Sequence, residues 1–177
     1  MRTTSTLLTV FILLGTVATG SAQDVVQGFS GIRWGTSIED VRGLHETARS
    51  GDIHYYKRAE DFYSIAGVTL SELIYGFYQG QYFAAYMPLN SPADFAKVKK
   101  HLDTVYGDAR AQLRINQTIY IWDFLEVKIK LKQYRNQPRS KLAFYYVPLS
   151  TRANTAKSGT GSETILPLDP GEPEYDF

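Results

Sequence analysis

Residues 28–41 read GFSGIRWGTSIEDV, and they contain the clearest structural signals in the chain. Gly35 permits a sharp turn directly after Trp34, because glycine adopts backbone conformations that a Cβ disfavours. Thr36 fits the N-cap of a helix, with a glutamate three residues later that can reach back to the cap amide. The stretch therefore predicts a short opening strand, a tight turn and a first helix over residues 36–47.

The ring of Trp34 can be interpreted in two ways. It could anchor the hydrophobic core where the fold begins, or it could belong to an exposed binding loop. Large aromatic side chains mostly serve cores, so a core position is the expectation.

The same stretch resembles the opening of a broad set of small secreted bacterial proteins of unknown function, in which Phe-x-Gly-Ile-x-Trp-Gly-Thr leads into a short acidic-capped helix. The matching residues are Phe29, Gly31, Ile32, Trp34, Gly35 and Thr36. A weaker likeness is to the small envelope lipoproteins of outer-membrane assembly and to the β-lactamase-inhibitor fold. These resemblances imply an exported location and an α+β architecture, and they bring no catalytic residues. The chain lacks the cysteine that lipid attachment would need.

Residues 1–22 have the pattern of a secretory signal peptide. Arg2 supplies the positive start, residues 7–18 are mostly apolar, and small residues precede a cleavage site after Ala22. The apolar run is shorter than the roughly 20 residues of a spanning helix. We therefore expect an exported protein, periplasmic or extracellular, with no transmembrane segment after cleavage.

The composition of the remaining chain limits its chemistry. It would have 155 residues, which suits one domain, with 18 basic and 18 acidic residues. Formal neutrality argues against non-specific binding of nucleic acid. The absence of cysteine excludes disulfides, thiol catalysis and thiolate metal sites.

A second helix has stronger local signals than the first. Ser91 fits the N-cap, and Pro92 follows at the first helical position, where its missing amide does no harm. Apolar residues recur at spacings of three and four, and Gly107 is the expected stop. The apolar stripe consists of Phe95, Val98, Leu102 and Val105.

Runs of strand-forming residues predict an antiparallel sheet. Gln79 and Gly80 form a plausible hairpin loop between two of the runs. In residues 124–134, Leu125, Val127, Ile129 and Leu131 alternate with Glu126, Lys128, Lys130 and Lys132, which predicts one buried and one solvated face. The predicted strands are residues 53–58, 73–78, 81–87, 115–122, 124–134 and 142–147.

The predicted fold class is α+β. We expect one domain over residues 23–149, with an antiparallel sheet of about six strands and two helices on one face. The order of elements suggests two α-β-β-β units, over residues 36–88 and 91–148. Residues 150–177 are poor in residues to bury and end in acidic ones, so they predict a disordered acidic tail.

Two surfaces are candidate binding sites. Tyr75, Phe77, Tyr82 and Tyr86 surround the Gln79-Gly80 loop and could form an aromatic groove for a peptide, glycan or small ligand, or else belong to a partly covered sheet face.

The second candidate, for an anionic partner, is the basic ladder of Lys128, Lys130 and Lys132 continued by Arg135. The alternative is a solvent-exposed strand face without a binding role, whose lysines protect the sheet from aggregation. The acidic tail residues Asp169, Glu172, Glu174 and Asp176 have the opposite charge, which suggests that the tail folds back on this ladder.

No catalytic motif is present. His45, His54 and His101 do not form a His-Glu-x-x-His pattern, and there is no Gly-x-Ser-x-Gly elbow, phosphate loop or calcium loop. We therefore expect no cofactor and no metal. The leading hypothesis is a secreted, non-enzymatic envelope module that binds a protein or a small ligand. The alternative is a hydrolase or metal-dependent enzyme whose site is dispersed along the chain.

Overall fold

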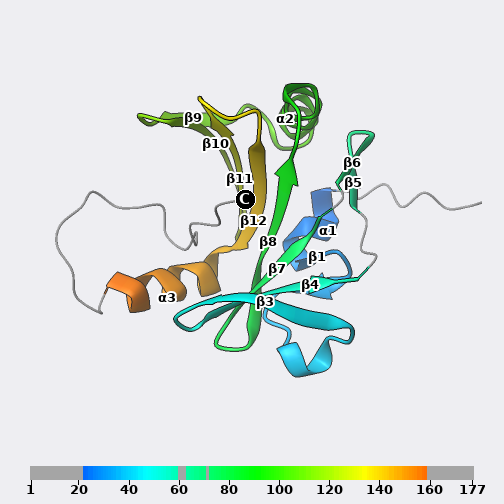
Figure 1. Ribbon diagram of the computed structural model, residues 1–177, viewed down its shortest axis with the longest axis vertical. Helices are drawn as coiled ribbons and strands as arrows, with labels where there is room; N and C mark the ends of the chain where they lie inside the picture. The colour runs from blue at the N-terminus through cyan, green and yellow to red at the C-terminus, as the bar shows by residue number, and fades with distance from the viewer. Residues whose placement is uncertain (1–21, 60–62, 71, 159–177) are drawn as a thin grey trace, which may run out of the picture.

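The computed structural model describes residues 22–59, 63–70 and 72–158, and its centre is an eight-stranded antiparallel sheet (Figure 1). The strand order is β3-β4-β7-β8-β12-β11-β10-β9. The bounds are β3 Leu44–Ser50, β4 Ile53–Arg58, β7 Ile74–Tyr78, β8 Gln81–Leu89, β9 Arg110–Leu113, β10 Gln117–Phe124, β11 Val127–Tyr134 and β12 Ser140–Tyr146. The predicted α+β class and antiparallel sheet are confirmed, with more strands than the expected six.

Two four-stranded meanders make up this sheet. The first, β3-β4-β7-β8, is followed by helix α2 (Pro92–Tyr106), and the second, β9-β10-β11-β12, is followed by helix α3 (Val147–Ser158). The meanders join where β8 pairs with β12. The repeated unit is therefore four strands and then a helix, and the predicted α-β-β-β unit is wrong. The unit changes because each meander begins with a strand, β3 or β9, that the sequence patterns did not indicate.

The predicted first helix over residues 36–47 is wrong. A single 3₁₀ turn, Ile38–Asp40, is capped by Ser37, whose hydroxyl accepts from the Glu39 amide, and β3 follows. The backbone before this turn is already bonded to the β7–β8 hairpin: Gly35 N–H donates to the Tyr82 carbonyl at 2.8 Å, and Tyr82 N–H donates to the Thr36 carbonyl at 2.9 Å. Sheet pairing thus overrides the local helix signal. The turn after Trp34 is confirmed, since Gly35 has a φ of +81°.

The Gln79-Gly80 hairpin and helix α2 are confirmed. Gln79 and Gly80 have φ of 49° and 75°, as a two-residue turn with positive φ at both positions requires. The Ser91 hydroxyl accepts from the Asp94 amide at 3.1 Å, and Gly107 ends the helix with a φ of 85°. On the predicted stripe, Phe95, Val98 and Leu102 are buried.

The sheet has a hydrophobic core on each face, and the two long helices lie on opposite faces. Phe95, Val98 and Leu102 of α2 pack into one core, together with α1 (Ala22–Gln27) and two small hairpins, β1–β2 (Gly28–Phe29 and Ile32–Arg33) and β5–β6 (Tyr63–Ile65 and Val68–Leu70). Leu149 and Ala153 of α3 pack into the other core. Figure 1 shows α3 and the β5–β6 hairpin on opposite sides of the sheet. The expectation of two helices on one face is therefore wrong, because the strands carry apolar side chains on both faces.

Helix α3 also corrects the expectation of disorder from Ser150. Leu149 and Ala153 are 5% and 3% exposed, so the sheet stabilises a helix in a segment with weak helical signals of its own. Helical structure thus continues to Ser158, past the expected domain end at residue 149. The expected tail beyond it, and the expected signal peptide apart from Ala22, lie outside the described residues. Within the described residues, no helix is long and apolar enough to cross a membrane.

Candidate functional site, a basic pocket beside helix α3

The predicted alternation is confirmed for Val127, Ile129 and Leu131, but it is wrong for Leu125, which is 78% exposed in the turn before β11, and for two of the lysines. Val127, Ile129 and Leu131 are fully buried in the core beneath α2. Lys130 and Lys132 point to the other face, where a solvated ladder was expected, but they are only 6% and 3% exposed. The Lys130 ammonium lies 5.2 Å from the centre of the Tyr145 ring. Long lysine stems can pack along a sheet in this way, and an aromatic face favours the cation.

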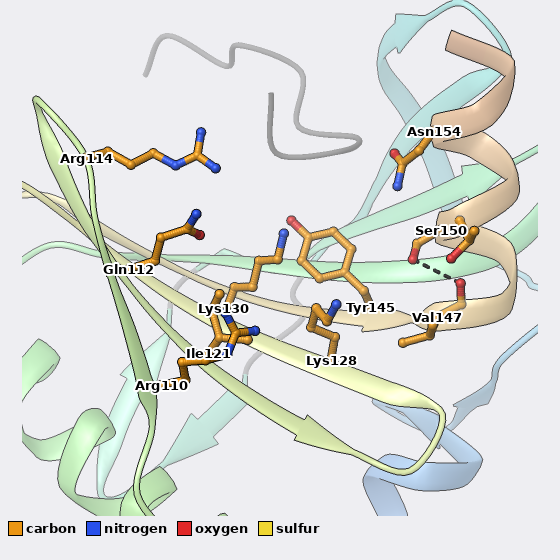
Figure 2. Close-up of a pocket in the computed structure, with 11 residues that line it drawn as sticks. Arg110, Gln112, Arg114, Ile121, Lys128, Lys130, Tyr145, Val147, Ser150 and Asn154 are labelled. Atoms are coloured by element: carbon orange, nitrogen blue, oxygen red, sulfur yellow. Dashed lines mark hydrogen bonds between the residues drawn. The ribbon is translucent and has the colours of Figure 1, made fainter. Parts of the chain in front are cut away.

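A cavity of about 280 Å³ opens on this same face, between the second meander and α3 (Figure 2). Strands β9, β10, β11 and β12 supply one wall, and the first turns of α3 supply the other. Its lining residues are Arg110, Gln112, Arg114, Ile121, Lys128, Lys130, Tyr145, Val147, Ser150, Thr151 and Asn154.

The strand register explains why these side chains converge. Lys128 lies opposite Tyr145 across β11–β12, and Lys130 lies opposite Ile121 across β10–β11. Ile121 in turn lies opposite Arg110 on the edge strand β9. Directly paired residues of antiparallel strands project from the same face, so residues that are distant in the sequence share one wall.

The pocket is strongly positive. Four of its lining residues are Arg or Lys, and among the residues that the structure describes none in the lining is acidic. Asp123 lies at the rim, where it pairs with Arg110 at 3.4 Å and with Lys128 at 3.5 Å. These are exposed pairs, which stabilise little and leave the cations accessible to a competing anion. The remaining polar lining consists of Gln112, Tyr145 and three α3 side chains, and it offers uncharged hydrogen-bonding groups.

The charge distribution along the chain also favours a positively charged pocket. Residues 110–158 contain ten Lys and Arg but only two acidic residues, Asp123 and Glu126. Residues 159–177 contain five acidic residues and no basic one. The overall balance of 19 basic to 18 acidic residues therefore conceals a basic second meander with its helix, followed by an acidic segment.

The predicted basic surface coincides with this pocket only in part. Lys128 and Lys130 line it, whereas Lys132 and Arg135 do not. Arg135 is exposed in the turn after β11, where its amide donates to the Asn116 carbonyl at 2.9 Å. Sequence reasoning missed Arg110, Arg114 and the α3 residues, because β9 and α3 were themselves missed. The run of basic residues after position 110 was the signal that could have indicated them.

The predicted aromatic groove is not formed. Tyr75, Phe77 and Tyr82 are fully buried in the core beneath α2, and Tyr86 is buried on the opposite face. The register shifts between Gly76 and Phe77, and this irregularity places Tyr86 on the other face from Tyr82. A one-residue shift reverses which side chains share a face, so simple alternation grouped these residues incorrectly.

The histidines lie on three different elements. His45 is on β3, His54 on β4 and His101 on α2, so His45 does not lie in a helix, as the predicted helix over residues 36–47 implied. His54 Nδ1 lies 3.2 Å from a Glu46 oxygen, and Arg49 donates to the other oxygen at 3.1 Å. Hydrogen bonds, first from Arg49 and then from His54, lower the pKa of Glu46 below its usual range. In the described part of the chain, no group of three or more His, Asp and Glu residues could hold a metal ion.

A second depression lies near the chain start. It has a volume of about 530 Å³ and is lined by Gly31, Ile32, Arg33, Thr36, Asp40, Val41, Arg42 and Arg58. Asp40 contributes a carboxylate to this lining, so its positive charge is partly offset. The pocket beside α3 is therefore the stronger candidate for an anion.

Comparison with protein-family models, curated proteins and solved structures finds no match to this chain.

Proposed function

We propose that this protein is an exported, non-enzymatic module of the cell envelope that binds an anionic ligand in the basic pocket beside α3. The observation that supports the binding site most strongly is the convergence of four Arg and Lys side chains on one cavity with no acidic lining residue among those described. The signal-peptide pattern of residues 1–22 and the resemblance of residues 28–36 support the exported location.

The lining indicates the chemistry of the ligand. Guanidinium groups bind carboxylate, phosphate and sulfate through paired hydrogen bonds, and two arginines are present. The amide of Asn154 lies on the α3 side of the pocket (Figure 2) and, with the hydroxyl of Thr151 in the same lining, could orient a polyoxyanion. The Ser150 hydroxyl also lines this side, where it donates to the Val147 carbonyl at 3.2 Å. A volume of about 280 Å³ lies at the small end of ligand pockets. The ligand is therefore a small, multiply charged oxyanion, or such a group at the end of a larger molecule.

Calorimetric titration with inorganic tripolyphosphate, and separately with citrate, tests this function and distinguishes phosphate from carboxylate ligands. The informative variant is Arg114→Gln combined with Lys128→Gln. Losing two charged contacts of roughly 1 kcal/mol each should weaken binding by on the order of ten-fold or more.

The matched control is Lys97→Gln combined with Lys100→Gln. It removes the same charge from exposed positions on α2, on the opposite face of the sheet. If both double variants lower the affinity equally, the effect comes from net charge alone and the pocket is not the binding site. An unaltered affinity in the pocket variant would equally contradict the proposal.

A further inference from the structure

The acidic C-terminal segment is the best electrostatic match to the pocket within this chain. Residues 163–176 contain Glu163, Asp169, Glu172, Glu174 and Asp176, and residues 159–177 contain no Lys or Arg. Residues 1–158 contain all 19 basic residues and 13 acidic ones, an excess of six positive charges. Ten of those basic residues follow position 109, in the part of the fold that builds the pocket.

The place where the acidic segment joins the fold also favours it as an occupant of the pocket. Helix α3 forms one wall of the pocket through Ser150, Thr151 and Asn154, and the chain leaves this helix at Ser158. Asn154 and Ser158 are one helical turn apart, or about 6 Å along the axis. Eleven residues from Ser158 to Asp169 can span up to about 35–40 Å. The acidic residues are therefore within reach of the Arg110 and Arg114 side of the pocket.

We propose that residues 163–176 occupy the basic pocket of their own chain and that an external anion binds by displacing them. This inference rests on the proposed function, since it assigns a competitor to the same site. A segment tethered so close has an effective concentration on the order of millimolar, so contacts that are individually weak suffice to fill the site. An external anion must first displace the segment, so its apparent dissociation constant is higher than it would be for an empty pocket.

The test compares tripolyphosphate binding by the chain from Gln23 to Phe177 with that of a tail variant, measured at about 0.1 M salt. The tail variant carries Asp169→Asn, Glu172→Gln, Glu174→Gln and Asp176→Asn. It should bind tripolyphosphate on the order of five-fold more tightly, because its segment competes less. The difference should shrink as salt is added, since screening weakens the attachment of the segment.

The control for net charge is a variant with four exposed acidic residues neutralised elsewhere: Glu39→Gln, Asp40→Asn, Asp52→Asn and Asp108→Asn. If this control tightens binding as much as the tail variant does, the effect is long-range charge and the inference is overturned. An unchanged affinity in the tail variant also overturns it.

A second measurement does not depend on any probe. In the absence of ligand, the backbone NMR signals of Gln112, Ser150 and Thr151 should differ between the parent and the tail variant, because these residues line the pocket. Identical signals would overturn the inference even if tripolyphosphate failed to bind. Conversely, if the Arg114→Gln and Lys128→Gln pair weakens tripolyphosphate binding while the tail variant matches the parent in both measurements, the anion site stands and only the tail inference fails.

Discussion

The indole of Trp34 stacks on the ring of Tyr82, with 4.8 Å between the ring centroids and 23° between the planes. The indole N–H also donates to the Val25 carbonyl at 2.8 Å. Trp34 is half-buried and packs against the core beneath α2. The side chain thus ties the opening segment to the β7–β8 hairpin, in agreement with the expected core position.

Replacing Trp34 by Ala should therefore destabilise the domain by about 3 kcal/mol, near the lower end for truncating a large aromatic because the ring is only half-buried. Urea unfolding measures this change. Trp34→Phe keeps a stacking ring but loses the hydrogen bond, and it should cost less. A Trp34→Ala protein that unfolds like the parent would show that the stack contributes nothing to stability.

Among the glycines that the structure describes, Gly28 is the one at which a side chain is least tolerable. An added Cβ would collide with the Ile32 carbonyl oxygen and would lie 2.7 Å from the Arg33 Cα, both backbone atoms of the paired strand β2. Gly28→Ala should force β1 and β2 apart and cost roughly 2–3 kcal/mol, as severe overpacking does. Gly76→Ala is the comparison, because its nearest contacts are side-chain atoms at 3.1–3.3 Å. A smaller loss at Gly28 than at Gly76, measured by thermal or urea unfolding, would argue against the β1–β2 pairing.

Tyr106 should make stability fall at high pH. Burial is the main cause that raises the pKa of its phenol from about 10 to about 12. Between about pH 10 and 12 the phenol stays neutral in the folded state while it ionises in the unfolded chain. The free energy of unfolding therefore has its full value below about pH 10 and declines over this range. Tyr106→Phe should flatten this decline, as measured by urea unfolding across that range. In absorbance titration the parent should contain a tyrosine with a midpoint near 12 that the variant lacks.

Protonation of Glu46 should lower the stability of the fold at acidic pH. Its pKa is lowered from 4.5, chiefly by the hydrogen bond from Arg49. A depressed pKa stabilises the fold above the unfolded value, and this contribution is lost as the pH falls through the folded value. NMR titration of the Glu46 side chain should give a midpoint below 4.5, and Arg49→Gln should raise it. The pair is exposed, so the effect on stability should be small.

The proposed export predicts a defined N-terminus. Arg2, the apolar residues 7–18 and the small residues up to Ala22 predict cleavage between Ala22 and Gln23. Protein recovered from its native host should therefore begin at Gln23 in N-terminal analysis. A form that retains Met1 and stays in the membrane fraction would contradict both the cleavage and the exported location.

Elements with local chemical signals were predictable from the sequence alone. Ser91, Pro92 and Gly107 bound α2 through caps and backbone preferences that depend on neighbouring residues. The Gln79-Gly80 turn and strands β4, β7, β8, β11 and β12 likewise follow from turn chemistry and from runs of strand-forming residues. Half of the pocket's positive lining, Lys128 and Lys130, was identified in the same way.

The features that depend on tertiary pairing could be determined only from the three-dimensional structure. Residues 36–47 carry helix signals, but hydrogen bonds from Gly35 and Tyr82 hold the preceding backbone against the β7–β8 hairpin. The register shift beside Gly76 determines the face of Tyr86. Burial of Leu149 and Ala153 on the sheet stabilises α3, which then closes the basic pocket opposite Arg110 and Arg114. For residues 36–47 and for α3 the stabilising partner lies far away in the sequence, so local propensity records only one side of the interaction.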